Sequence, residues 1–282
     1  MENHSLNLSR EEQQLSAGVT GKMSTRAILK AQKKQLRSLM KSKLSSVPEE
    51  SIRAQSQSIF ESLKTFQPYL DAQRVGIYLS MPTGEVQTDA IVRHALGSGK
   101  KVFVPYIIKN KDRPVDTSSS IKPADAEPRS LMDMVDLRSL HDYESLKPDA
   151  WGIPSISADT IEERAHILKD AAEELQGLDL ILMPGVAFDA DAKTGLINRL
   201  GHGKGFYDYF LERYDQIVRA PHQEDSSGRQ KKDVLLYGLA LKEQVVGSRT
   251  TSEVDTVPTG PFDRSLHGLL VGSGEIKQGH AP

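Results

Sequence analysis

The stretch "RVGIYLSMPTGEVQTDAIVRHALGSGKKVFVPYI", residues 74–107, decides the fold. Its two ends, 74–80 and 100–107, are rich in residues that favour strands. The residues between them are typical of a helix that a glycine ends. The stretch therefore predicts a βαβ unit, in which a helix connects two parallel strands.

The pattern continues toward the C-terminus. We expect a helix over 161–177, a fully buried strand over 178–188, a helix over 205–214 and another buried strand over 235–241. Residues 109–150 are rich in Pro, Ser, Asp and Lys, and we expect them to be irregular, with one or two short strands. The alternation predicts one α/β domain with a mainly parallel sheet and helices on both faces, a Rossmann-like layered fold.

Two helices are predicted before the βαβ unit. Residues 25–44 combine a helix-spaced apolar stripe with seven Lys or Arg residues and no acidic residue between Arg26 and Lys43, which indicates a basic amphipathic helix. The second begins after Pro48 and is expected to stop at Pro68. Residues 1–22 have no apolar signal core, so we expect a disordered tail followed by a single domain over 23–282.

The composition excludes several classes of function. The 282 residues are 38% hydrophobic and 26% charged with a formal charge of −2, which disfavours a nucleic-acid-binding protein. No apolar run is long enough to span a bilayer, so no membrane partner is expected. The absence of cysteine excludes disulfides and thiolate chemistry. We expect a cytoplasmic monomer that acts on small molecules.

A glycine-rich loop is the strongest chemical feature. "RLGHGKGFYDYF", residues 199–210, matches neither the dinucleotide-binding fingerprint nor the P-loop in spacing. A glycine-rich loop that enters a helix nevertheless offers free N–H groups to phosphate, and Lys204 adds a positive charge. Asp208 could hold Mg²⁺ on the same phosphates. The alternative is a tight surface turn in which Asp208 only favours a helix N-terminus.

The segment "LDLILMPGVAFD" followed by "NRLGHGKGFYDYFL" resembles the motif of the 5-formyltetrahydrofolate cyclo-ligase family, also called methenyltetrahydrofolate synthetase. Further blocks of this family occur in the same order. They are "KKQLR" near the N-terminus, "YLSMPTGEVQT", "KKVFVP", "WGIP" at Trp151, and a proline and an aspartate at Pro258 and Asp263. The resemblance covers residues ~30–275, nearly the whole chain outside the tail.

The resemblance implies an enzyme that uses ATP and Mg²⁺ to convert 5-formyltetrahydrofolate into 5,10-methenyltetrahydrofolate, with release of ADP and phosphate. In the mechanism of the family, phosphorylation of the formyl oxygen turns it into a leaving group, and N10 closes the ring. Such a reaction depends on the positioning of phosphate more than on acid or base catalysis.

The resemblance also implies roles for individual residues. Lys204 and Arg199 would be catalytic, and Asp208 and Asp263 would bind Mg²⁺. The residues that would contact ATP are Lys33, Arg37, Arg199, Gly201, His202, Gly203, Lys204, Gly205, Phe206 and Tyr207. The residues that would contact the folate are Leu79, Glu85, Trp151 and Tyr207.

Each of these roles has a structural alternative. Lys33 and Arg37 lie four residues apart, opposite the apolar stripe, and could form a solvated basic face, with Lys34 as the rival of Lys33. Asp263 could cap a loop, and Glu85 could cap a helix. The side chains that could instead belong to the core are Leu79, Trp151 and Tyr207.

Four departures from the family pattern stand out. His202 replaces an arginine, Phe206 replaces a tyrosine, His267 replaces a second late carboxylate, and the segment between Asp189 and Arg199 is longer than usual. These changes leave a second hypothesis open: a catalytically silent protein on the same fold that binds a nucleotide or a folate.

Overall fold

We analysed a computed structural model of the chain, which describes residues 24–109, 130–170, 177–218, 233–247 and 256–279. The predicted disordered tail, residues 1–22, lies outside the described residues. The helices are α2 (Thr25–Ser45), α3 (Glu49–Leu63), α4 (Gln67–Asp71), α5 (Asp89–Gly97), α6 (Leu140–Glu144) and α8 (Phe206–Ile217), with 3-10 helices η2 (Ala158–Glu163) and η3 (Lys242–Gln244). The strands are β1 (Arg74–Ile77), β2 (Lys101–Lys109), β3 (Ser130–Leu137), β4 (Lys147–Pro148), β5 (Pro154–Ser155), β6 (Leu180–Met183), β7 (Ala187–Ala190), β8 (Ile197–Leu200), β9 (Leu235–Ala240), β10 (Gly268–Val271) and β11 (Ile276–Gln278).

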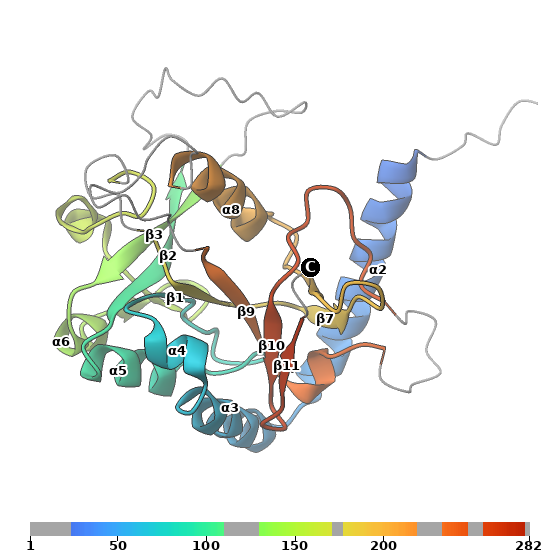
Figure 1. The fold of residues 1–282 in the computed structure, drawn as a ribbon, viewed down its shortest axis with the longest axis horizontal. Coiled ribbons are helices and arrows are strands. Elements are labelled where there is room, and N and C mark those ends of the chain that lie inside the picture. Colours follow the sequence, from blue (N-terminus) through green and yellow to red (C-terminus); the bar gives the residue numbers. More distant parts are fainter. Residues whose placement is uncertain (1–23, 110–129, 171–176, 219–232, 248–255, 280–282) are drawn as a thin grey trace, which may run out of the picture.

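A seven-stranded sheet forms the centre of the molecule, in the order β11-β10-β9-β6-β1-β2-β3 (Figure 1). Strands β10, β9, β6, β1 and β2 pair in parallel, while β11 and β3 are antiparallel strands at the two edges. The prediction of a mainly parallel sheet is confirmed. The βαβ unit is confirmed as β1, α5 and β2, in which Val75 pairs with Val102.

The sheet is buried on both faces. Successive side chains of a strand point to opposite faces, and each face has its own core of buried residues. In β6, Leu180 and Leu182 belong to the core that α3 and α5 cover. Ile181 and Met183 belong to the second core, beneath α8. Figure 1 shows α3, α4 and α5 on one face and α8 on the other, as predicted.

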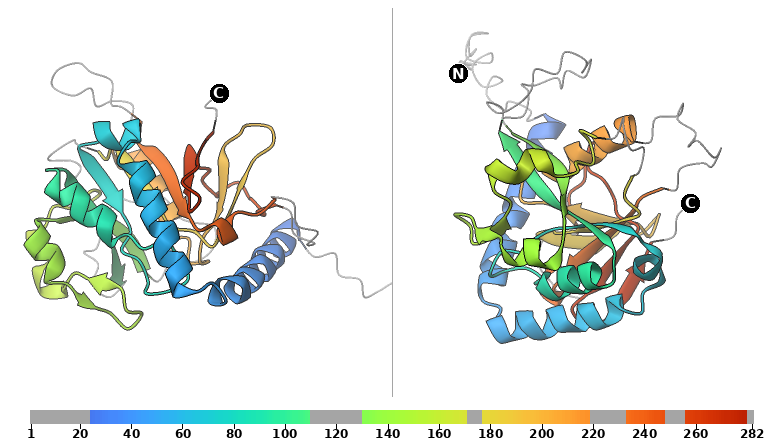
Figure 2. Two further views of the ribbon diagram at one scale, coloured as in Figure 1. Left: turned by 90° about the horizontal axis from the view of Figure 1, so that it is seen from below. Right: turned by 90° about the vertical axis from the view of Figure 1, so that its left-hand side faces the viewer.

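The predicted basic amphipathic helix is α2. Ser24 caps its N-terminus, since the Ser24 side chain accepts a hydrogen bond from the N–H of Ala27. Leu36, Met40 and Leu44 are its buried residues. Figure 2 shows that α3 covers the sheet while α2 extends beyond it, so one side of α2 remains available to the loops described below.

Two sequence-based predictions of secondary structure are wrong. The buried strand over 178–188 is two strands of different sheets, because the chain turns at Pro184 and Gly185 between β6 and β7. The helix over 161–177 does not form in its described part, which contains the end of η2 and an isolated bridge from His166 to Val135 of β3. There the N–H of Ile167 bonds to the carbonyl of Met134 instead of to a helical turn.

Smaller differences concern the helix before the sheet and the strands that the sequence analysis did not identify. Helix α3 already ends at Leu63, so Pro68 does not stop it; Pro68 lies instead in the first turn of a separate helix, α4. Two strands fall in the region that was expected to be irregular: β3, which forms an edge of the main sheet and is longer than expected, and the short strand β4; residues 110–129 lie outside the described residues. Strands β5, β8, β10 and β11 were not predicted.

The hairpin of β7 and β8 carries the chain from the sheet to the glycine loop. In its register, Phe188 faces Arg199 and Asp189 faces Asn198. At its tip, residues 191–196, Asp191 Oδ1 accepts hydrogen bonds from the N–H groups of Lys193 and Thr194. The register of the hairpin therefore fixes the position of Arg199 in β8, directly before the glycine loop.

Candidate active site

The site lies where the strand order of the sheet reverses. From β1 the chain continues to β2 on one side, and it later crosses to β6 on the other side of β1. Ligands of open α/β sheets bind at this kind of position, beyond the carboxyl ends of the strands. Leu79 and Glu85 follow β1, and Arg199 donates a hydrogen bond to the carbonyl of Pro184, directly after β6 (3.3 Å). The topology thus brings the predicted folate and phosphate residues to one edge.

Arg199 is buried and bound to Asp208. Its side chain is 3% exposed, and Nη2 lies 3.1 and 3.2 Å from the two carboxylate oxygens of Asp208. The guanidinium carbon also lies 5.4 Å from the centre of the Tyr207 ring. Within the described residues, the Nε of Arg199 has no hydrogen-bond partner. Arg199 therefore orients Asp208 and Tyr207 at the start of α8.

The glycine loop wraps around the side chain of Arg37 from α2. Arg37 Nε donates to the carbonyl of Gly201 (2.8 Å), and a side chain at Gly203 would place its Cβ 3.2 Å from the Arg37 guanidinium carbon. Gly203 also has φ 95°, and Gly205, the N-cap of α8, has φ 70°, both in the left-handed region. The glycines therefore serve the close approach of a cation and the turn into the helix.

Lys33 and Asp263 form the second ion pair of the site. Lys33 Nζ lies 2.6 and 2.5 Å from the Asp263 carboxylate oxygens, and the two side chains are 17% and 23% exposed. Lys34 is exposed. The structural alternative, in which Lys33 and Arg37 form a solvated face opposite the apolar stripe, is wrong, because both are partly buried against the loops at 201 and 263.

Two of the predicted folate contacts, Glu85 and Tyr207, lie close enough for the Glu85 charge to affect the ionisation of the Tyr207 hydroxyl. Burial raises the pKa of Glu85 to about 7, although the N–H of Met81 donates a hydrogen bond to its carboxylate (2.6 Å). Burial also raises the pKa of the Tyr207 hydroxyl; the Arg199 charge acts against this, and Glu85 adds to it. The Tyr207 oxygen is buried without a hydrogen-bond partner among the described residues. An incoming polar ligand could satisfy it.

The other two predicted folate contacts flank these groups. Leu79 is half-buried and packs against the core on the α3 side. Trp151 is 74% exposed, so the alternative of a buried anchor is wrong. A side chain at Gly152 would place its Cβ 2.7 Å from Pro82, which puts the Trp151 turn against the loop that carries Glu85.

The remaining loop residues differ in exposure. Lys204 is exposed, and no hydrogen bond or ion pair joins it to another described residue. His202 is also on the surface. Partial desolvation, followed by the positive charges of Arg199 and Arg37, lowers the pKa of His202, so the imidazole is neutral at pH 7. Phe206 is partly buried against the core beneath α8.

Two carboxylates in this region could hold Mg²⁺. Among the described residues, no group of three or more His, Asp or Glu side chains is arranged to hold a metal ion. Mg²⁺ commonly binds through one or two carboxylates together with substrate phosphates, however. The N–H of Arg264 donates to Asp208 (3.2 Å), which brings the residue next to Asp263 against Asp208. The donor set fits a phosphate-dependent Mg²⁺ site.

His267, at the position of a family carboxylate, has a structural function. Its Nδ1 accepts a hydrogen bond from the N–H of Leu236 (2.9 Å), and its own N–H donates to the carbonyl of Leu236 (2.9 Å). Nδ1 is therefore used to align β9 with the start of β10 and is not free for a metal ion.

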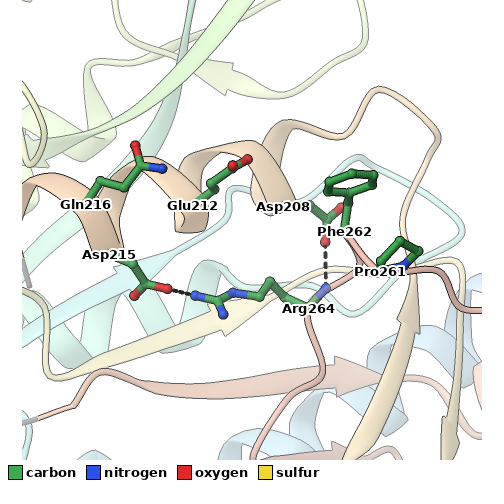
Figure 3. Close-up of a pocket in the computed structure, with 7 residues that line it drawn as sticks. All are labelled: Asp208, Glu212, Asp215, Gln216, Pro261, Phe262 and Arg264. Carbon is green, nitrogen blue, oxygen red and sulfur yellow. Dashed lines mark hydrogen bonds and ion pairs between the residues drawn. The ribbon is translucent and has the colours of Figure 1, made fainter. Parts of the chain in front are cut away.

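A pocket opens on the side of α8 next to Asp208 (Figure 3). Its lining residues are Asp208, Glu212, Asp215, Gln216, Pro261, Phe262 and Arg264. Apart from Asp208, none was predicted as a site residue. Two features of the sequence could have indicated these lining residues. Phe262 and Arg264 are the neighbours of Asp263, and Glu212 follows Asp208 at the i, i+4 spacing that places two side chains on one face of a helix.

No helix in the described part of the chain is both long enough and apolar enough to cross a membrane.

Comparisons with known proteins agree with the geometry. Residues 29–271 match the model of the 5-formyltetrahydrofolate cyclo-ligase family. A Caenorhabditis elegans protein described as a probable 5-formyltetrahydrofolate cyclo-ligase is 32% identical over 227 residues, which cover 80% of this chain and 90% of the relative. The 5-formyltetrahydrofolate cyclo-ligase of Saccharomyces cerevisiae is 30% identical over 247 residues, or 87% of this chain and 98% of the relative.

A solved structure supports the fold. The NMR structure of Aquifex aeolicus 5,10-methenyltetrahydrofolate synthetase superimposes with a TM-score of 0.53 at 21% identity, covering 87% of this chain and 92% of that chain.

Proposed function

Because the chain belongs to the 5-formyltetrahydrofolate cyclo-ligase family, we propose that it cyclises 5-formyltetrahydrofolate to 5,10-methenyltetrahydrofolate and converts ATP to ADP and phosphate. One observation carries the proposal beyond the family match. The glycine loop, two cations of α2 and the Asp263 segment come together at the switch point of the sheet. This arrangement suits a triphosphate beside a second substrate.

The phosphates of ATP would lie over the glycine loop. Lys33 and Arg37 approach the loop from α2, and Lys204 projects from it as an unpaired cation among the described residues. The N–H groups of 201–205 would complete the cradle. Lys204 is the catalytic residue in this proposal, since its positive charge can stabilise the negative charge on the phosphoryl group during the transfer. Arg199, which is buried, acts through Asp208 as a positioning residue.

Asp208 and Asp263 would hold Mg²⁺ together with the phosphates. The ion would neutralise charge on the phosphate oxygens as ATP reacts. Arg199 and Lys33 keep the two carboxylates apart and oriented when no ligand is bound. Lys33 would exchange part of its bond to Asp263 for a phosphate oxygen.

The folate would lie beyond β1, between the loop at 79–87 and the start of α8. Glu85, with its raised pKa, can accept a hydrogen bond from the pterin or donate one as the neutral acid. The unpartnered Tyr207 hydroxyl can bond to the same ligand. Leu79 and the exposed Trp151 would supply apolar contact.

The two substrates would then react in two steps. The formyl oxygen attacks the γ-phosphorus, the bond to the bridging oxygen breaks, and ADP leaves. The N10 nitrogen attacks the formyl carbon and loses its proton, and phosphate leaves with the former formyl oxygen. Holding the two substrates together at the switch point makes the first step intramolecular in character, while the second step already takes place within the folate.

Other properties remain part of the proposal. We assign residues 23–282 to a single domain that acts as a cytoplasmic monomer on small molecules, without a nucleic-acid partner. The match of residues 29–271 to one family model supports a single domain.

The test follows the absorbance of methenyltetrahydrofolate after the protein is mixed with 5-formyltetrahydrofolate, ATP and Mg²⁺. An increase in absorbance that requires ATP supports the proposal. Binding of ATP or folate without any increase in absorbance would instead support the catalytically silent binding protein. A reaction that proceeds equally without ATP would contradict the proposed use of phosphate.

A further inference from the structure

The loop between β1 and α5, residues 78–88, is closed by one side chain that has no role in the proposed function so far. The amide nitrogen of Gln87 donates hydrogen bonds to the carbonyls of Met81 and Glu85, both at 3.0 Å. The amide oxygen accepts a hydrogen bond from the Ser80 hydroxyl (3.4 Å). Gln87 is partly buried, so these bonds are partly shielded from water. One side chain thus joins residues 80 and 81 to residue 85.

Met81 is held at both of its backbone groups. Its N–H donates to the Glu85 carboxylate (2.6 Å), and its carbonyl accepts the hydrogen bond from Gln87. Burial raises the pKa of Glu85, and the N–H of Met81 acts against this by favouring the ionised carboxylate. The position of Met81 therefore affects both the direction of the Glu85 carboxylate and its ionisation.

Gln87 is itself anchored to the core of the protein. Its N–H donates to the hydroxyl of Ser56 in α3 (2.9 Å), and the buried Ser56 donates in turn to the carbonyl of Ile52 (2.7 Å). The next residue, Thr88, is also buried and donates to the carbonyl of Tyr78 (2.8 Å). The loop is therefore tied to α3 and to the end of β1, although its tip at residues 82–83 is exposed.

We propose that Gln87 is a positioning residue for the folate, which holds Met81 so that the Glu85 carboxylate meets the pterin in one orientation. The inference rests on the proposed function, which places the folate between this loop and the start of α8. Two other titratable groups face Glu85, Tyr78 after β1 and Tyr207 in α8. Burial raises the pKa of both hydroxyls, and the Glu85 charge adds to it, so neither ionises near pH 7.

The first test replaces Gln87 with methionine, which has a similar size but no N–H donor. Gln87→Met should raise the KM for 5-formyltetrahydrofolate about fivefold to tenfold and change the KM for ATP less than about twofold, because only the folate side of the site loses hydrogen bonds. Calorimetric titration with each substrate alone should show the same difference. Gln57→Met, which removes an exposed amide from α3, is the matched control and should change neither constant.

A second variant covers the case in which Gln87→Met does not fold. Gln87→Glu keeps the size and the acceptor oxygen, but its ionised carboxylate cannot donate to the two carbonyls. It should therefore repeat the selective rise in the KM for the folate.

The pH dependence of kcat/KM for the folate is a readout that a merely structural role would not change. This ratio reports ionisations of the free enzyme, and the pKa of Glu85 is about 7. Without Gln87, the N–H of Met81 would stabilise the carboxylate less, so the inflection should move to higher pH in Gln87→Met. Ionisation of the free folate is the same for both enzymes and does not affect the comparison.

Several results would overturn the positioning role while the proposed function stands. They are an unchanged KM for the folate, equal rises in both KM values, an inflection that stays at the wild-type pH, and a failure of both variants to fold. If the wild-type protein does not bind 5-formyltetrahydrofolate, both proposals fail.

Discussion

Lys33 of α2 and Asp263 form an ion pair although 230 residues separate them in the chain. The pair joins α2 to the segment before β10, on the side of the site where we propose that phosphate binds. Lys33→Met should raise the KM for ATP about tenfold or more, since it removes a charged hydrogen-bond donor. Steady-state kinetics measure the change, and Lys34→Met, on the exposed side of the same helix, should behave as wild type. Equal effects of both substitutions would assign only a general electrostatic role to α2.

Lys204→Ala should keep the fold and lower kcat about 10²- to 10³-fold, because it removes a cation from the developing charge on the transferred group. Lys204 is exposed, so the melting temperature should not move. Lys193→Ala, at the tip of the β7–β8 hairpin, removes another exposed lysine and is the control. A Lys204→Ala enzyme with near wild-type turnover would exclude the residue from catalysis.

Asp208→Asn should raise the Mg²⁺ concentration needed for half-maximal rate several-fold, since an amide is a poorer ligand for a hard cation than a carboxylate is. The KM for the folate should change much less. Titration of the rate with Mg²⁺ and with folate separates the two effects. An unchanged Mg²⁺ requirement would leave Asp208 only its structural pairing with Arg199.

His202 should make ATP binding depend on pH. Its lowered pKa leaves the free imidazole neutral at pH 7, and bound phosphate would raise that pKa by favouring the protonated form. Binding should therefore take up a proton, and kcat/KM for ATP should fall as pH rises from the free to the bound pKa. His202→Arg should flatten this decline, because the guanidinium keeps its charge at every pH of the measurement. Superimposable profiles at saturating folate and Mg²⁺ would mean that His202 does not face phosphate.

Glu85 should lower stability as pH rises. Its folded pKa of about 7 lies above the ordinary value, so the unfolded chain releases its proton first and stability declines from about pH 4.5 through 7. The loss from this group is on the order of 3 kcal/mol. Glu85→Gln should remove that part of the slope in chemical denaturation, whereas Glu162→Gln on the surface should not. Parallel slopes for wild type and Glu85→Gln would show that Glu85 ionises freely.

The local patterns predicted the elements whose partners lie nearby in the sequence. The β1-α5-β2 unit, α2 and α8 have clear periodicity and end signals, and all were confirmed. The motif also identified Arg199, Gly201 and Gly203, which the structure brings against Asp208 and Arg37. Short strands such as β10, with four residues, carry too little pattern to be recognised alone.

Long-range contacts decided what the patterns missed. Residues 161–170 have helical periodicity, but Asp133 of β3 bonds to the N–H of Leu168 (3.0 Å) and lies 3.3 Å from the ring of His166. These contacts hold the segment against the sheet in place of a helix. The inward position of Lys33 depends likewise on Asp263, which no window of neighbouring residues contains.

The β7–β8 hairpin offers a place where the chain can change length without changing its chemistry. Asp189 and Asn198 still pair above the tip, so the extra residues that distinguish this chain from the family pattern end in a turn at 191–196. The glycine loop leaves from the opposite end of the hairpin. An epitope or a fluorescent label inserted at the tip would therefore report on the protein in solution while Arg199 keeps its register.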